Sequence, residues 1–87
     1  MSTNSYPMDA ARFAQLRQDL ADAGATMTFT DPTQNTGSFN PPGHSEITIG
    51  FAFAAGALQL TVLHESWYEN ADEIWSGLAT YLPEPNA

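Results

Sequence analysis

The fold of this chain is decided by one stretch, residues 47–63, which reads ITIGFAFAAGALQLTVL. Large apolar residues alternate with small or polar ones on both sides of Ala55-Gly56, and a period of two is typical of half-buried strands. The pair Ala55-Gly56 suits a tight turn. The stretch therefore predicts two strands, over 46–54 and 57–63, that pair as an antiparallel hairpin.

Outward from this hairpin, towards the N-terminus, two further elements are indicated. Residues 25–30 also alternate, with Ala, Met and Phe between threonines, and predict a third strand. Before it, apolar residues recur at spacings of three and four, which predicts an amphipathic helix over 10–23. Asp9 stands at the position of an N-cap, and Gly24 stands where helices commonly end.

Towards the C-terminus, the sequence predicts a second helix over 71–82. Asn70 and Glu73 have the spacing of a capping box, and Pro83 cannot continue the helix. Four apolar residues mark its inward face, namely Ile74, Leu78, Tyr81 and Leu82. The remaining segments are expected to be a polar tail at 1–7, a long polar loop at 31–45 and a short tail at 83–87.

These elements predict one domain, 1–87, of the α+β class in the order α-β-β-β-α. We expect a three-stranded antiparallel sheet with both helices on its apolar face, because two layers bury that face. The opposite face carries small, polar and uncharged residues and would stay open to solvent or to a partner; they are Thr26, Thr28, Thr48, Gly50, Ala52, Gln59 and Thr61.

The charge of the chain is unusual because basic residues are missing. It has no Lys, two Arg and ten Asp or Glu, which gives a formal net charge of −8. Both Arg, at 12 and 17, lie on the first predicted helix. Affinity for nucleic acid depends on neutralising phosphates with Lys and Arg, so direct nucleic-acid binding is excluded. A basic protein surface would attract this chain instead.

The residue types that carry catalysis are sparse. There is no Cys, hence no disulfide and no thiolate metal site. His44 precedes Glu46, and His64 precedes Glu65, but neither His has a metal-ligand spacing. Each His–carboxylate pair could act as an acid–base unit, but the sequence favours a solvated His in the loop and another at the end of a strand. We expect a protein without enzymatic activity, cofactor or metal.

The location expected from the sequence is the cytoplasm of a bacterial cell. The N-terminal residues lack the basic and apolar regions of a signal peptide. The apolar run 47–60 is interrupted and too short to span a bilayer, and an anionic lipid surface would repel the chain. We expect a monomer that does not bind membranes.

Carboxylates interleaved with aromatic residues predict a binding surface, because charges steer a partner and rings anchor it. The candidate contact residues are Glu65, Glu69, Asp72 and Glu73, with Trp67 and Tyr68 as anchors. Asp31 and Glu46 form a second group that flanks the long loop. The alternative for Asp72 and Glu73 is structural, since acidic residues stabilise a helix N-terminus.

In its composition the chain resembles the small phage-encoded inhibitors of bacterial defence, the anti-CRISPR proteins and DNA mimics. That resemblance implies carboxylates that replace phosphates on a basic channel. Residues 68–75, YENADEIW, are also similar to the inhibitory helix of the barstar family in the mutual spacing of Asn70, Asp72 and Trp75. Ser76 replaces that family's second Asp, so Asp72 alone carries over as a toxin contact.

The sequence thus favours a stoichiometric inhibitor of a basic, nucleic-acid-binding surface in a CRISPR–Cas complex. Two alternatives stay open. One is an immunity protein against a basic toxin nuclease, and the other is a small phage structural or adaptor protein.

Overall fold

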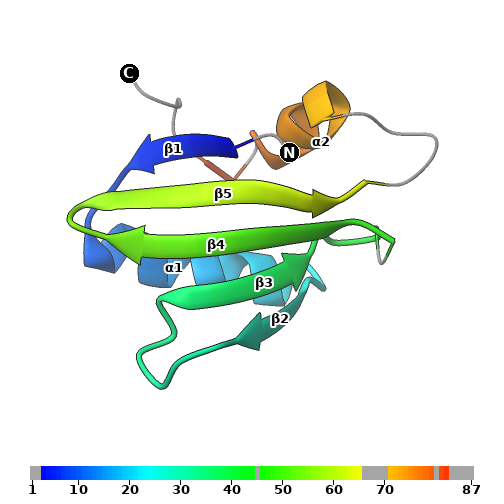
Figure 1. Cartoon of the computed structure of the whole chain (residues 1–87). Coiled ribbons are helices and arrows are strands. Elements are labelled where there is room, and N and C mark those ends of the chain that lie inside the picture. Colours follow the sequence, from blue (N-terminus) through cyan, green and yellow to red (C-terminus); the bar gives the residue numbers. More distant parts are fainter. Residues whose placement is uncertain (1–2, 45, 66–70, 80, 83–87) are drawn as a thin grey trace.

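The structure is a computed structural model that describes residues 3–44, 46–65, 71–79 and 81–82, with the backbone alone for 71–73. It is an α+β fold with one antiparallel sheet of five strands in the order β1-β5-β4-β3-β2 (Figure 1). The elements in chain order are β1 Thr3–Pro7, α1 Ala10–Asp22, β2 Thr26–Phe29, β3 Thr36–Asn40, β4 Thr48–Ala54, β5 Ala57–His64 and α2 Ala71–Leu78.

The predicted hairpin is confirmed as β4 and β5, which form the centre of the sheet. Ile49 pairs with Val62 and Phe51 with Leu60, so the large apolar side chains of both strands share one face. The two turn residues have positive φ values, 53° at Ala55 and 76° at Gly56. Two such residues give the turn whose twist matches that of the flanking strands.

The predicted tail at 1–7 is wrong, because residues 3–7 form the edge strand β1. This strand pairs antiparallel with β5, and Tyr6 lies opposite Leu58 with only 3% of its surface exposed. Thr3 and Thr61 face each other with their hydroxyl oxygens 3.0 Å apart. The burial of Tyr6 explains why so polar a segment is ordered on the sheet.

The predicted loop at 31–45 is also wrong in part, because its middle forms β3. Phe39 is buried and pairs with Ile49 on one side and Met27 on the other, which makes β3 the link between β2 and β4. A single large apolar residue gives too weak an alternation to reveal a strand. The three-stranded sheet expected from the sequence therefore gains a strand at one edge and another in its interior.

The first helix agrees with its prediction to within one residue. Asp9 caps α1 by accepting a hydrogen bond from the Arg12 amide at 2.8 Å. Gly24 follows the helix with a φ of 103°, a conformation that favours glycine. The Ala25 amide then donates to the Leu20 carbonyl at 2.9 Å, so the chain turns directly from α1 into β2.

The second helix is shorter than predicted. α2 ends at Leu78, and the Tyr81 amide donates to the Leu78 carbonyl in a tight turn instead of continuing the helix. Tyr81 and Leu82 still pack against the core, although they are not on a helix as expected. The apolar pattern marked burial correctly but did not distinguish a helix from the turn after it.

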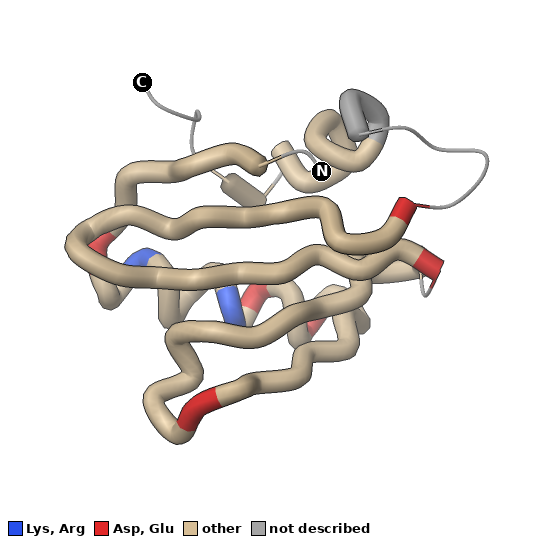
Figure 2. The backbone as a smooth tube through the Cα atoms, in the orientation of Figure 1, with Lys and Arg blue, Asp and Glu red and all other residues tan. Residues whose placement is uncertain are grey.

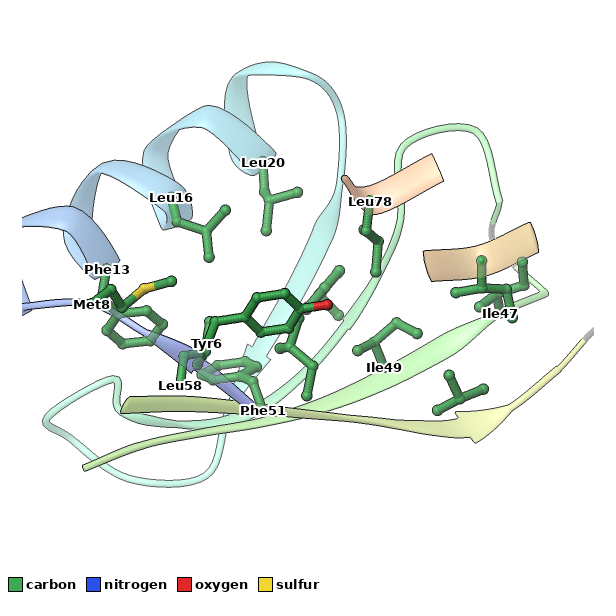
Figure 3. Packing of buried hydrophobic residues seen from close by; sticks show 14 residues of the cluster. Tyr6, Met8, Phe13, Leu16, Leu20, Ile47, Ile49, Phe51, Leu58 and Leu78 are labelled. Atoms are coloured by element: carbon green, nitrogen blue, oxygen red, sulfur yellow. The ribbon is translucent and has the colours of Figure 1, made fainter. Parts of the chain in front are cut away.

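The core lies between the helices and one face of the sheet (Figure 3). Phe13 of α1 stacks on Phe53 of β4 at 4.7 Å between ring centroids. Ile74 and Leu78 of α2 join the same cluster as the α1 residues. Neither helix in the described part of the chain is long and apolar enough to cross a membrane.

The other sheet face has the small, uncharged character expected of it. Thr26, Thr28, Ala52 and Gln59 are exposed there. Leu63 is the large apolar exception, with 49% of its surface exposed.

Candidate functional site

Strand pairing brings two of the candidate carboxylates to one end of the sheet. Thr48 of β4 pairs with His64 of β5. Glu46 comes two residues before Thr48, and Glu65 directly follows His64, so the two residues lie at the same end of this strand pair (Figure 2). We call Glu46 and Glu65 the acidic end. The sequence analysis assigned them to separate groups, because the register of β4 against β5 was not known.

A β-bulge shapes β5 just before the acidic end. Ile49 pairs with Val62 while Thr48 pairs with His64, so Leu63 has no partner in the register. Bulges bend a strand and redirect the side chains that follow. Leu63 lies over Gly50, where a Cβ atom would be 3.0 Å from the Leu63 Cδ1 atom. The exposed Leu63 side chain therefore stands beside the acidic end on the open face of the sheet.

The segment that carries Glu46 is held by short-range hydrogen bonds. The His44 amide donates to the Pro41 carbonyl at 3.0 Å, and the Ile47 amide donates to the His44 carbonyl at 3.1 Å. The Asn40 side chain donates to the Ile47 carbonyl at 2.7 Å. The Glu46 carboxylate lies 3.8 Å from His44 Nδ1.

An apolar cavity of about 160 Å³ lies next to this segment. It is formed between the 41–47 segment and the C-terminal part of the fold, with Pro41, Ile47, Leu78 and Tyr81 in its wall. A volume of this size suits one apolar side chain, and partner side chains that fill such pockets carry much of the binding energy in protein interfaces. Nothing in the sequence marked Pro41 and Tyr81 as neighbours, because they come from segments far apart.

The residues at the acidic end include both histidines of the chain. His44 lies near the Glu46 carboxylate, whereas His64 is exposed at the end of β5, with Glu65 next to it in the sequence. Within the described ranges, no three His, Asp or Glu side chains are grouped so that they could hold a metal ion. The arrangement combines negative charge, one exposed apolar side chain and a small apolar cavity, which are the ingredients of a protein-binding surface.

Asp31 lies away from the acidic end and has a structural role. It follows β2 at the turn into β3, and that turn borders Phe53 near the opposite end of β4, where the Phe53 amide donates to the Asn35 carbonyl at 2.8 Å. The Asp31 carboxylate accepts hydrogen bonds from the Thr33 hydroxyl and from the Thr36 amide and hydroxyl. These bonds, led by that from Thr33, lower the pKa of Asp31.

Most of the other predicted contact residues lie outside the described part of the chain. This applies to Trp67, Tyr68 and Glu69 as a whole, and to the side chains of Asp72 and Glu73. The backbone of Asp72 and Glu73 forms the first turn of α2. Their role as contacts stays a prediction.

Both arginines of the chain are turned back onto the protein. Arg12 donates through Nη2 to the Tyr81 carbonyl at 2.5 Å. Arg17 donates through Nη1 to the Gln34 side chain at 2.8 Å and lies over the ring of Phe13. Both belong to α1, away from the acidic end (Figure 2). The only two fixed positive charges of the sequence are thereby used in internal contacts.

Comparison of the chain with protein-family models, with curated proteins and with solved structures finds no match.

Proposed function

We propose that this protein is a non-enzymatic, stoichiometric inhibitor that binds a basic nucleic-acid-binding surface of a bacterial CRISPR–Cas complex and blocks the binding of DNA. The observation that carries the proposal is the distribution of charge. The chain has a net charge of −8, and its two arginines are engaged with Tyr81, Gln34 and Phe13. A basic partner therefore meets carboxylates without a competing free cation.

The acidic end supplies the contact in this proposal. Glu46 and Glu65 flank one end of the central strand pair, where carboxylates can take the place of two phosphates. Leu63 and the cavity beside Ile47 add apolar surface next to the charges. Charges raise the rate of association, whereas buried apolar contacts hold the complex together after it forms.

The experiment measures DNA binding by a purified CRISPR effector complex while the protein is added in increasing amounts. Inhibition should be complete near one copy per effector, and DNA itself should not bind the protein. The association rate should fall as ionic strength rises from about 0.05 to 0.15 M, because salt screens long-range attraction. An association rate that does not change over this range would refute charge-driven binding.

A basic toxin nuclease serves as the comparison partner in the same assay. Tight binding to the nuclease with none to the effector complex would transfer the proposal to an immunity protein. Binding to neither would leave the acidic surface without the proposed function.

A further inference from the structure

The apolar layer between α1 and the sheet is open on the side of β2. Among the described strands, β2 is an edge strand, with β3 on one side only (Figure 1). A groove of about 430 Å³ runs between α1 and β2. The first wall is formed by side chains of α1, and the second by the inward side chains Met27 and Phe29. The α1 residues are Ala14, Arg17, Gln18 and Ala21, and Gln34 of the turn before β3 also lines the groove.

The apolar side chains of β2 that line this groove are only partly covered by the rest of the protein. Met27 and Phe29 alternate with the exposed Thr26 and Thr28, and both are only half-buried although they point towards the helix layer. The ring of Phe29 packs against Phe51 at 5.9 Å, edge to face, on its inner side. One more strand beside β2 would place alternate side chains between Met27, Phe29 and the small alanines of α1.

The backbone of β2 has hydrogen-bonding groups that face outwards. The Thr30 amide donates to the Thr36 carbonyl, so Thr30 and Thr36 form a hydrogen-bonded pair. In an antiparallel pair of strands, hydrogen-bonded pairs recur at every second residue. Thr28 and Thr26 therefore bond to β3. The amide and carbonyl groups of Met27 and Phe29 point towards the free edge, with the spacing that an added strand requires.

The sequence of β2 does not protect this edge. Natural edge strands are commonly very short, or are blocked by a charged residue, a proline or a bulge. Of these features, β2 has only the short length, four residues. Thr26–Phe29 contains no charged residue and no proline, and its register with β3 has no irregularity. The edge strand on the other side of the sheet, β1, ends in Pro7.

The geometry points to β2 as the docking edge for an extended strand of the basic target, with apolar side chains at alternate positions in the groove and Lys or Arg at its end. This inference rests on the proposed function for the choice of partner. The net charge of −8 favours a basic occupant, and Asp31, two residues beyond Phe29, adds a carboxylate near the groove. The cation that lines the groove, Arg17, is engaged with Gln34 and with the Phe13 ring. A second copy would bring another −8 to the same edge.

The test uses the full chain and a synthetic peptide, acetyl-Lys-Val-Thr-Val-Thr-Val-Lys-amide, observed by amide NMR and hydrogen exchange. On binding, the amides of Met27 and Phe29 should become protected, whereas those of Thr26 and Thr28 should change little because they already bond to β3. A peptide N-methylated at the amides that face β2 should bind at least about tenfold more weakly. Equal binding of the two peptides would overturn strand addition.

Matched variants separate the backbone contact from side-chain packing. Met27→Pro removes the outward N–H of β2, and Met27→Ala removes the side chain but keeps that N–H. The peptide should bind Met27→Pro at least about tenfold more weakly than Met27→Ala. If Met27→Pro does not fold, the N-methylated peptide decides alone.

Two further outcomes identify the occupant. Protection of Met27 and Phe29 that rises with protein concentration, without any peptide, would overturn the proposal in favour of a second copy. A peptide with Glu in place of both Lys should bind more weakly, and equal binding would overturn the basic character of the partner. Failure of the peptide to bind, with salt-dependent inhibition of the effector intact, would reject this inference and leave the proposed function standing.

Discussion

Arg17 lies with its guanidinium carbon 4.9 Å from the centroid of the Phe13 ring, one helical turn earlier on α1. The same Phe13 ring stacks on Phe53 of the sheet, so the cation is attached to the core. Its Nη1 atom also donates to the side chain of Gln34. One side chain thus joins α1 to the turn between β2 and β3, at the end of the groove where Phe29 lies.

This contact predicts a graded loss of stability when Arg17 is shortened. Arg17→Ala should lower the free energy of unfolding by about 1–2 kcal/mol, because it removes a cation–π contact and a charged hydrogen bond. Arg17→Met should lose about half as much, since its chain still covers the Phe13 ring. Urea unfolding of the three proteins measures the effect. Equal losses in both variants would show that packing of the stem contributes nothing.

The surroundings of Gly37 predict that adding a single methyl group there, as in Gly37→Ala, strongly lowers the stability of the fold. A Cβ atom at this position would overlap the Thr28 carbonyl oxygen and lie 2.9 Å from the Phe29 Cα atom. Gly37→Ala should therefore cost about 2 kcal/mol or more, because backbone atoms of β2 cannot move away without breaking their pairing.

The matched control for Gly37→Ala is Gly77→Ala, on α2. Nothing lies within 4 Å of the Cβ position there. This variant should gain up to about 0.5–1 kcal/mol, since Ala favours a helix over Gly. Thermal unfolding of both variants checks the pair, and a similar shift of the melting temperature in both would contradict the close approach of β2 and β3.

The comparison of β4 and β3 shows what the sequence could predict. β4 and β5 have long, regular alternation, so their hairpin was predicted with its turn. β3 has Phe39 as its only large apolar residue, and β1 has Tyr6, so neither could be recognised. The position of β2 at the edge of the sheet could not be predicted for the same reason. Because β3 was not recognised, the sequence could not show that β2 pairs with β3.

The sequence could predict which residues belong to the candidate site, but it could not predict which of them lie close together in the fold. Glu46 and Glu65 were both proposed from their sequence context, but the pairing of Thr48 with His64 brings them to one end. Asp31 was grouped with Glu46 because both flank the same segment. Since β3 occupies the middle of that segment, its two flanks lie at different ends of the sheet.

The hydrogen bonds of Asp31 predict a pH dependence of stability. They lower the pKa of its carboxyl, led by the bond from Thr33, below the value of about 3.9 in an unfolded chain. Stability from this carboxylate is then present above the unfolded pKa and is lost as pH falls through the folded pKa. The native protein should be more stable than Asp31→Asn at neutral pH, and the difference should shrink from about pH 5 downwards. A difference that stays constant to pH 2 would contradict this assignment.

The acidic end predicts that the position of a charge matters more than the net charge. Glu65→Lys and Asp19→Lys each reverse one carboxylate, so they change the net charge equally. Glu65 is exposed beside Glu46, whereas Asp19 lies on α1 and accepts a hydrogen bond from Gln15 at 2.8 Å. Glu65→Lys should weaken inhibition of the effector complex at least about tenfold, because a like charge would face the basic surface at close range.

The folding of these variants is checked separately. The free energy of unfolding of Glu65→Lys should stay within about 0.5 kcal/mol of the native value, since an exposed substitution disturbs little packing. Asp19→Lys should reduce the association rate only through the smaller net charge, and its effect should vanish in high salt. The loss in Glu65→Lys should persist there, because contacts at short range are screened less. Equal losses in both variants at every salt concentration would show that the acidic end is not the contact.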